Sequence, residues 1–532
     1  MCGIFGYLGT RPCTGSETAR LLEHAAKCRH RGPDQSRSGL YCEGRAFLVF
    51  HRLKVVDTSD KGMQPFRHRE WASVCNGEIY NHARLRKEHG LEVASECDAE
   101  VVAPLVRKVG GAAACRLLDG VFAFLAVSAA GQAWVGRDPI GVRPLFLGRG
   151  DRGDLVVASE AKSIPPGFRV EPFPPGCVSC FQWSPEAQAW RENRARYCEN
   201  KFPYVLEPPA AAEHKIRALL GAAVAKRTMS DRPIGCLLSG GLDSSIIAAI
   251  LSAQAPKGQR LRTFSIGLAG AVDLEYARLV AAHLGTDHTE VVVSEAELLA
   301  AIPRAIYHAE SYDVTTVRAA APMLLLSEHI ARETDVAVVF SGEGSDEASG
   351  SYIYFHNAPD PAAFRAETER LLGELHYFDV LRCDRATAAA GLEVRVPFLD
   401  RAFLDYYMSL GPEMKQPVAG VEKHLLRKTF AGLLPAEVAW RKKEGMSDGV
   451  SSMGRPWYGV IQEQARGLYS EAALRQWPAG ANAPQTLEAH HFRVLFEGFF
   501  PGRGGLVPHY WLPKWSGDVK DPSARVLAAY AR

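Results

Sequence analysis

Residues 234–245 read IGCLLSGGLDSS, and this stretch decides the fold of the longer part of the chain. The apolar run 234–238 has the length of a buried strand, and a helix is expected over residues 244–252. The Gly-rich turn between them offers backbone N–H groups and Ser hydroxyls to a phosphate. A bare Gly-Gly is more often a tight turn. The lysine of GxxxxGK[ST] is missing, which disfavours a Walker-type NTPase.

Strands and helices alternate on both sides of this stretch. Further helices are expected over residues 212–227 and 274–284, and further strands over residues 262–266, 290–293 and 336–340. This alternation predicts a doubly wound α/β fold, in which a parallel sheet carries helices on both faces. The chain beyond residue 360 is expected to be a mainly helical extension, and its Pro/Gly/Trp-rich stretch, residues 500–515, indicates no function.

The first part of the chain has a different pattern of apolar and turn-forming residues. Short apolar runs, such as residues 46–49, 121–127 and 155–158, are broken by Gly, Pro, Asn and Asp, which predicts a strand-rich α+β domain. Residues 181–209 lose this pattern and are interpreted as a linker. We therefore predict two domains, residues 2–205 and 206–532.

The charge balance and composition of the chain indicate which classes of partner are not favoured. The 62 basic and 60 acidic residues leave a net charge of +2, so nothing favours nucleic acid or an anionic membrane as a partner. Neither a spanning apolar run nor a secretory signal pattern is found, and a cytoplasmic location is expected. The 12 cysteines are scattered, and Cys177 and Cys180 lack a second pair for a zinc site. Most are expected to be small buried hydrophobes.

One cysteine stands out by position. If Met1 is removed, the Cys2 thiol lies beside its own α-amine, whose ordinary pKa of about 8 lets it act as a base. Arg52 can grip a carboxylate, and Glu78 with Asp98 can hold an ammonium group, which together describe an amino-acid ligand. Asn76-Gly77 is either a hairpin turn or an oxyanion hole.

Eight motifs in order carry a resemblance: CGI 2–4, RGPD 31–34, HRL 51–53, NGEIYN 76–81, DAE 98–100, LDG 118–120, GRD 136–138 and ASEAK 158–162. They resemble the class II, or N-terminal nucleophile (Ntn), glutamine amidotransferases. The resemblance implies a four-layer α/β/β/α domain that hydrolyses L-glutamine through a cysteinyl thioester on Cys2. It implies an oxyanion hole at Asn76 and Gly77. The implied glutamine-binding residues are Arg52, Leu53, Lys54, Val55, Val56, Asn76, Gly77, Glu78 and Asp98.

A second loop, SGEGSDE 341–347, follows the expected strand 336–340. Its three acids could belong to a solvated loop. Alternatively, both loops lie at the carboxyl ends of parallel strands, where ligands bind, and Asp243 and Asp346 share Mg²⁺ on a pyrophosphate. SGGLDSS itself resembles the pyrophosphate loop of ATP-pyrophosphatases.

With EVRVPFLD 393–400 and EKHLLR 422–427, nearly the whole chain resembles the glutamine-hydrolysing asparagine synthetases. SYIYFH 351–356 and DPSAR 521–525 are similar to the longer, eukaryotic-type members. The resemblance implies that ATP converts L-aspartate to β-aspartyl-AMP, that Glu343 bears on this step and that ammonia displaces AMP. It implies ATP-binding residues Leu237, Ser239, Gly240, Gly241, Asp243, Ser244, Ile266, Ser341, Gly342 and Lys423. A homodimer is retained as a candidate assembly, and a shielded ammonia passage is expected.

Two departures from the family pattern are Ser351 and KKEGM 442–446, and neither is expected to touch a loop that carries chemistry. The aspartate pocket has only candidates by residue type, Thr315, Thr316, Arg318 and Arg395. Alternatives remain: an amidotransferase that adenylates another carboxylate, a β-lactam-forming synthetase, or a binding protein without activity. Cys2, Arg52 and Asp98 argue against the second, and the complete set of catalytic groups argues against the third.

Overall fold

The computed structural model describes residues 1–478, 480, 482–527 and 530. The chain forms two compact units. The first comprises Met1–Asn200 with the short segments Met229–Arg232 and Ala388–Glu393, and the second comprises the remainder. The units are therefore not consecutive stretches, whereas the predicted domains, residues 2–205 and 206–532, are.

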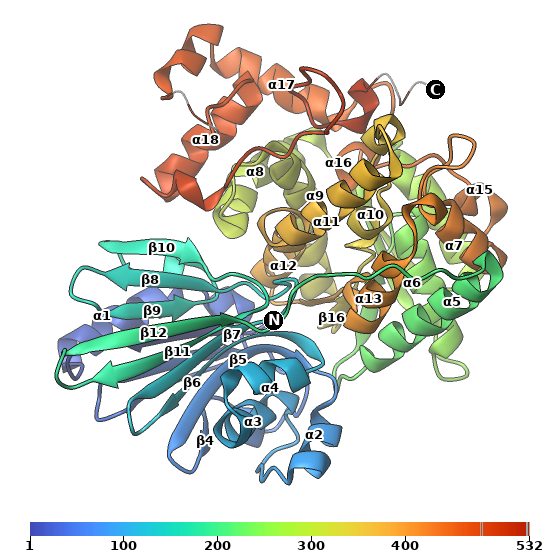
Figure 1. Cartoon of the computed structure of the whole chain (residues 1–532). Coiled ribbons are helices and arrows are strands. Elements are labelled where there is room, and N and C mark those ends of the chain that lie inside the picture. Colours follow the sequence, from blue (N-terminus) through green and yellow to red (C-terminus); the bar gives the residue numbers. More distant parts are fainter. Residues whose placement is uncertain (479, 481, 528–529, 531–532) are drawn as a thin grey trace. The chain divides into compact units, whose positions relative to one another are not determined.

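The first unit contains two six-stranded antiparallel sheets (Figure 1). One has the order β10-β8-β9-β1-β3-β2 and the other β12-β11-β7-β6-β5-β4. Helix α1 (Gly15–Ala26) packs on the first sheet, and α3 (Val102–Val109) and α4 (Gly111–Leu117) pack on the second. The predicted four-layer α/β/β/α architecture is confirmed. The strands are β1 Gly3–Leu8, β2 Gln35–Tyr41, β3 Ala46–Arg52, β4 Phe66–His68, β5 Trp71–Ile79, β6 Gly120–Ser128, β7 Gln132–Arg137, β8 Phe146–Gly150, β9 Leu155–Ala158, β10 Phe168–Pro172, β11 Cys177–Ser184 and β12 Ala189–Arg196.

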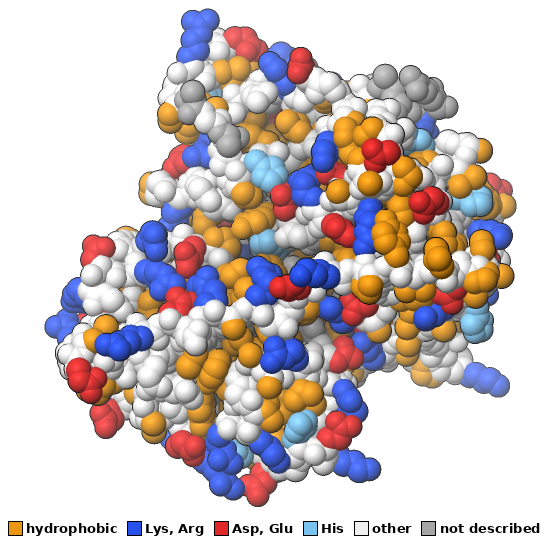
Figure 2. All heavy atoms as spheres, viewed as in Figure 1, with side chains coloured by type: hydrophobic (Ala, Val, Ile, Leu, Met, Phe, Trp, Pro, Cys, Tyr) orange, Lys and Arg blue, Asp and Glu red, His pale blue; other side chains and the backbone are white. Residues whose placement is uncertain are grey.

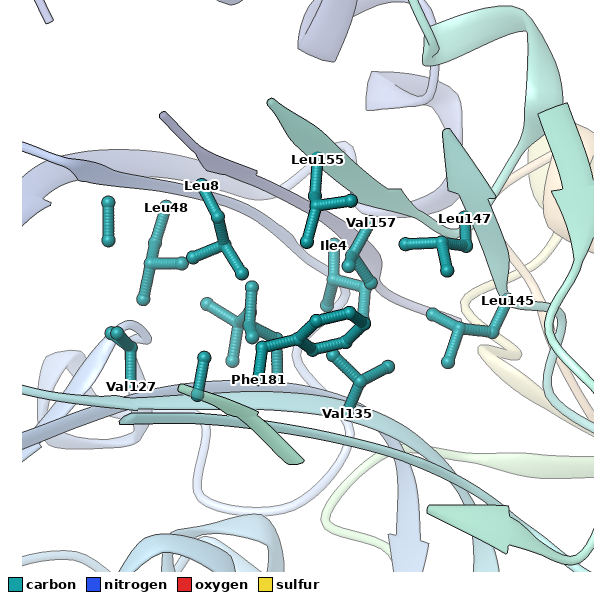
Figure 3. Packing of buried hydrophobic residues seen from close by; sticks show 14 of the residues in the cluster. Ile4, Leu8, Leu48, Val127, Val135, Leu145, Leu147, Leu155, Val157 and Phe181 are labelled. Carbon is teal, nitrogen blue, oxygen red and sulfur yellow. The ribbon is translucent and has the colours of Figure 1, made fainter. Parts of the chain in front are cut away.

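Strand β6 shows why this unit has continuous apolar runs. Ala123, Leu125 and Val127 belong to the core between the sheets, part of which Figure 3 shows. The alternate residues Phe122 and Phe124 belong to the core under α3 and α4. Because successive side chains of a strand point to opposite faces, a strand buried on both faces is apolar throughout.

The predicted linker, residues 181–209, is wrong in its first half. Residues 181–184 complete β11, and β12 pairs with it through Trp183 and Trp190, whose rings lie 5.6 Å apart. Strand β12 is the edge of its sheet and carries charged residues such as Arg191 and Arg194. Charged side chains protect an edge strand from pairing with other chains. They also interrupt the apolar pattern by which a strand is predicted, and so the sequence indicated a linker here.

The second unit is built on a five-stranded sheet of order β15-β14-β13-β16-β17. The pairs β13/β14, β13/β16 and β14/β15 are parallel, which confirms the doubly wound sheet. Chain order runs one way from β13 to β15 and then resumes on the other side of β13, so the topology switches between β13 and β16. Ligands bind at such a switch point. The strands are β13 Ile234–Leu237, β14 Arg262–Leu268, β15 Asp287–Val293, β16 Val338–Phe340 and β17 Glu393–Arg395.

The expected helices of this unit form, and others join them. Helices α8 and α9 fill the interval between β15 and β16, where no element was predicted. The chain beyond residue 360 is mainly helical, as expected. Helices of this unit include α5 Pro209–Lys226, α6 Leu242–Gln254, α7 Val272–Leu284, α8 Glu295–Ala309, α9 Val314–Glu333, α10 Ser345–Ser349, α12 Asp379–Ala389, α16 Met446–Gly449, α17 Trp457–Leu468 and α18 Leu487–Phe499.

The surface agrees with the balanced composition. Basic and acidic side chains are interspersed over the face shown in Figure 2. Among the described helices, none combines the length and the apolar character needed to cross a membrane. The stretch 500–515, which indicated no function, contributes Trp511 and Trp515 to an aromatic cluster with Tyr354 and Phe355.

Candidate active sites

Cys2 lies immediately before β1, in the first unit. Its Sγ is 3.7 Å from the carbonyl oxygen of Leu53, to which it donates. The Cys2 carbonyl accepts from Nε of Arg31 at 3.0 Å, and Arg31 is itself paired with the buried Glu160 at 3.0 Å. Arg31 and Glu160 were seen in the sequence only as motif residues. Their function here is to hold the backbone of the thiol residue.

Asn76 and Gly77 lie inside β5, so the hairpin-turn alternative is wrong. Asn76 is fully buried, and in the described structure neither atom of its side-chain amide has a hydrogen-bond partner. A buried unpaired amide costs about 1–3 kcal/mol, so it is rarely kept without a ligand to receive it. Gly77 has φ +153°, and a Cβ there would lie 2.0 Å from the Val121 carbonyl oxygen. Only glycine fits this position.

Two acids near Cys2, Asp98 and Glu78, both influence the pKa of the Cys75 thiol. Burial, and then the charges of Asp98, Cys2 and Glu78, raise the pKa of the Cys75 thiol well above its usual range. These three groups therefore lie around one region of β5. Asp98 is buried and accepts from the backbone N–H of Ile79 at 2.5 Å, which fixes its carboxylate.

Arg52 ends β3, and its guanidinium is held by backbone carbonyls. It donates to Ser59 at 2.6 Å and also to the carbonyl of Asp57. The residues that follow form a loop that begins at the thiol with Leu53. In this loop the Lys54 N–H donates to Asp34 at 2.7 Å, the Val55 carbonyl accepts from the Asp231 N–H at 2.8 Å, and Val56 comes next.

The protonation of the thiol depends on Met1. Met1 is fully buried, its amine donates to the Leu392 carbonyl at 3.3 Å and its Sδ contacts Arg143. Burial lowers the pKa of this amine to about 6 and raises the pKa of the Cys2 thiol to about 11. With Met1 in place, the thiol is protonated at neutral pH.

A cavity lies at the switch point of the second unit. Both predicted loops line it, and so do the predicted ATP-binding residues apart from Gly240. Gly240 faces α7 instead, since a Cβ there would lie 2.3 Å from the Ala277 nitrogen. The two loops touch at Gly342, where a Cβ would lie 2.7 Å from the Ser244 nitrogen. Glycine is required at both places.

Two carboxylates meet at one ammonium group in this cavity. Nζ of Lys423 lies 2.5 Å from Asp243 and 2.6 Å from Asp346, and Ser345 donates to Asp243 at 2.7 Å. Burial would raise the pKa of Asp346, but Lys423 and Lys443 outweigh it and hold that pKa well below its usual range. Glu347 is only 3% exposed. The solvated-loop interpretation of these acids is therefore wrong.

The expectation that the two departures avoid the chemical loops is also wrong. Nζ of Lys443 lies 2.7 Å from Asp346, and the Ser351 hydroxyl donates to the same carboxylate at 2.6 Å. Sequence distance concealed this: Lys443 follows Asp346 by 97 residues. Its position within a divergent stretch was not a signal for its role.

Arg382, on α12, lines the cavity but belongs to no motif that sequence analysis singled out. It binds both oxygens of Glu343 at 2.8 Å and Asp379 at 3.1 Å. Burial raises the pKa of Glu343 despite this contact. Arg382, Glu343 and Asp379 together place one positive and two negative groups on the lining of the cavity.

Of the four aspartate-pocket candidates, Thr315 alone lines the cavity. Thr316 donates to Asp313, which caps α9. Arg318 is buried in ion pairs with Glu488 and Asp521, and Arg395 donates to the carbonyl of Arg227. Residue type alone could not separate a pocket arginine from a structural one.

The fold and its sites define a class of protein. The first unit is an Ntn-type amidotransferase domain, with a cysteine at the start of two layered sheets. The second is an α/β synthetase domain with a phosphate loop at the switch point of its parallel sheet.

Comparisons with known proteins specify the family. The glutamine amidotransferase domain model matches residues 1–174, and the asparagine synthase model matches residues 215–372 and 358–496. Asparagine synthetases [glutamine-hydrolyzing] of Homo sapiens and Bos taurus are each 42% identical over 566 residues, covering 100% of this chain and 99% of theirs. That of Gallus gallus is 42% identical over 569 residues, with the same coverage. The chain belongs to the glutamine-hydrolysing asparagine synthetase family.

Proposed function

We propose that this chain makes L-asparagine from L-aspartate and ATP, using ammonia released from L-glutamine. One observation carries the proposal: the same chain holds, in its first unit, a thiol and a buried amide without a partner in the described structure and, in its second, a cavity where Lys423 and Lys443 meet Asp243 and Asp346. The first arrangement suits amide hydrolysis and the second suits cleavage of a nucleoside triphosphate. Family membership supports joining the two.

In the glutaminase step, Sγ of Cys2 attacks the amide carbon of glutamine and a C–S bond forms. The oxyanion is stabilised by the Asn76 amide and the Gly77 N–H. Collapse of the tetrahedral intermediate breaks the C–N bond and expels ammonia, which carries away the thiol proton. Water then hydrolyses the thioester to glutamate. Arg52 and Asp98 bind the α-carboxylate and α-ammonium groups, and the loop Leu53–Val56 with Glu78 completes the pocket.

In the synthetase step, the aspartate β-carboxylate attacks the α-phosphorus of ATP and pyrophosphate leaves. Leu237 and Ile266 offer apolar contacts to the purine, while the loop Ser239–Ser244 with Ser341 and Gly342 binds phosphates. Lys423 and Lys443 neutralise the leaving pyrophosphate. Glu343, oriented by Arg382, bears on formation of β-aspartyl-AMP. Ammonia then attacks the β-carbonyl carbon and AMP departs.

Mg²⁺ fits the carboxylate donors of this cavity. Asp243 and Asp346 each approach one Lys423 nitrogen, so their oxygens are close enough to share a cation. The described residues hold no group of three ligating side chains, and Mg²⁺ needs none because it binds through one or two carboxylates plus substrate phosphates. When bound, it would neutralise charge on the pyrophosphate.

A cytoplasmic location is proposed as well. None of the twelve cysteines, all of which lie in the described part, forms a disulfide, as expected in a reducing compartment. A homodimer stays a prediction, and sedimentation of the purified chain tests it.

A panel of carboxylates tests the substrate assignment. Pyrophosphate release should require L-aspartate, and L-glutamate, D-aspartate and succinate should support about a hundredth of that rate or less, because L-glutamate is longer by one methylene, D-aspartate misplaces the ammonium group and succinate lacks it. Equal release with another carboxylate would instead favour an amidotransferase of different substrate. Glutamine binding without turnover would favour a protein without activity.

Asn76→Ala should lower the glutaminase kcat by about 10²–10³-fold, because it removes one oxyanion donor. The KM for glutamine and the ammonia-dependent synthesis rate should stay near those of the unaltered enzyme. Asn193→Ala, at an exposed position of β12, is the matched control. An Asn76→Ala enzyme with the full glutaminase rate would remove Asn76 from the mechanism.

Material whose intact mass includes Met1 should lack glutaminase activity and alkylate slowly at Cys2. The thiolate is the reactive form, and a pKa of about 11 leaves only about 10⁻⁴ of it at pH 7. Iodoacetamide labelling of Cys2, followed by peptide mass spectrometry, should therefore rise about tenfold per pH unit from pH 7 to 10. A plateau below pH 8 in this material would contradict the assigned protonation.

A further inference from the structure

Lys443 is carried by a segment with little structure of its own. This segment, residues 442–452 and called here the Lys443 segment, contributes Lys442–Ser447 and Val450 to the lining of the ATP cavity. Its one regular element is α16, a helix of four residues. A helix this short is not stable alone, so contacts with the rest of the unit must fix the segment.

One set of contacts comes from the C-terminal tail, defined here as residues 521–527. The Ser523 hydroxyl donates to Asp448 at 2.7 Å, and the N–H of Ala524 donates to the other oxygen of that carboxylate at 3.2 Å. Nε of Arg525 lies 3.3 Å from Glu444, and its NH1 donates to the Ser452 carbonyl at 3.1 Å. The side chains of Arg525 and Glu444 are only 4% and 6% exposed, so this ion pair is buried.

The tail is anchored in turn to the helices of the same unit. Asp521 is paired with Arg318 of α9 at 2.8 Å and accepts from Gln462 of α17 at 2.6 Å. Leu527 belongs to the aromatic cluster that contains Trp511 and Tyr354. The tail is therefore a fixed support for the segment rather than a loose end.

On its other side the segment has contacts that do not involve the tail. Arg441, which precedes it, pairs with Asp273 at 3.1 Å and donates to the Gly240 carbonyl at 2.9 Å. The Val450 carbonyl accepts from the N–H of Leu268 at 2.9 Å. Loss of the tail contacts should therefore loosen the segment without unfolding the sheet.

We infer that the C-terminal tail positions Lys443 for pyrophosphate departure, with Arg525 as the main positioning residue. The inference rests on the proposed function, in which Lys443 neutralises the leaving group. None of the residues 521–527 lines the cavity, so the tail acts through the segment and not on ATP. A displacement of the ammonium group by about 1 Å is enough to cost about 10²-fold in rate.

Kinetics of Arg525→Ala provide the first test. The kcat of ammonia-dependent synthesis should fall by about tenfold or more, while the KM for ATP changes by less than about twofold, because the residues proposed to contact the purine are untouched. Arg525→Lys should restore much of the rate, since it keeps the charge beside Glu444. Ser523→Ala, a milder variant, should give a smaller loss, and glutaminase activity should be unchanged in all three.

Arg455→Ala is the matched control, because Arg455 is 54% exposed and pairs only with surface acids Glu295 and Glu463 in the contacts described. It should leave the synthetase rate unchanged. Equal rates for Arg525→Ala and Arg455→Ala would overturn the inference, as would a loss that appears in the KM for ATP alone.

A proteolysis readout separates this inference from the proposed function. Trypsin cleaves after lysine, and Lys442 and Lys443 are both held, by the Tyr530 carbonyl and by Asp346. In Arg525→Ala, cleavage at these two sites, identified by mass spectrometry, should be about tenfold faster than in the unaltered enzyme. The cleavage rate depends on the fraction of molecules in which the Lys443 segment is detached, and the substitution should raise that fraction. Unchanged cleavage would overturn the inference. If the unaltered enzyme made no asparagine but Arg525→Ala was still cleaved faster than it, the proposed function would be wrong. The inference that the tail holds the Lys443 segment would remain supported.

Discussion

Cys2→Ala will abolish glutamine-dependent asparagine synthesis and leave ammonia-dependent synthesis intact. Alanine lacks the nucleophile, so the thioester cannot form, and the expected loss of glutaminase activity is about 10³-fold or more. The synthetase cavity lies wholly in the other compact unit, so its chemistry needs no sulfur from Cys2. Steady-state asparagine formation with glutamine and with ammonium chloride measures both activities.

Cys13→Ala is the matched control, because Cys13 is a partly exposed thiol of the same unit that precedes α1. It should leave both activities unchanged. If Cys2→Ala lost both activities equally, the assignment of two separate sites would be wrong.

Asp243→Asn will remove AMP and pyrophosphate production and spare glutamine hydrolysis. The substitution keeps the shape of the side chain but deletes one of the two carboxylates that meet Lys423. A site that neutralises developing charge loses about 10²-fold or more when one charged member is removed. AMP and pyrophosphate are measured by chromatography, and glutamate release by a coupled assay.

The control for this variant is Asp287→Asn. Asp287 is exposed at the start of β15, and the amino ends of parallel strands lie at the edge opposite the loops. It should retain full ATP cleavage. ATP cleavage by Asp243→Asn at the unaltered rate would contradict the assignment of the phosphate cavity.

Local patterns were sufficient for most of the fold. The run IGCLLSGGLDSS combines a strand, a turn and a helix start within twelve residues, and all three form as β13, the loop and α6. The strand signals of the first unit are equally local. The errors came where tertiary packing decides the state: β12 is polar because it is an edge strand, and its place is set by pairing with β11.

The site residues show the same difference between local motifs and tertiary packing. Asn76, Gly77, Asp243 and Asp346 belong to compact motifs, and the structure brings Asp243 and Asp346 together at Lys423. Lys443 reaches Asp346 across 97 residues, so no window of the sequence contains both partners. Arg382 and Arg318 are both buried arginines on helices, and only the structure shows that one lines the cavity and the other pairs with Glu488.

In the proposed reaction, the amide nitrogen of glutamine enters asparagine through an adenylated aspartate. This route is tested most directly by mass spectrometry of the products formed from amide-¹⁵N-glutamine, β-carboxyl-¹⁸O-aspartate and ATP, with unlabelled ammonium present. We expect ¹⁵N in the asparagine amide and ¹⁸O in AMP, with no ¹⁸O in pyrophosphate. Recovery of ¹⁸O in inorganic phosphate alongside ADP, or an asparagine amide that contains no ¹⁵N at all, would contradict this route.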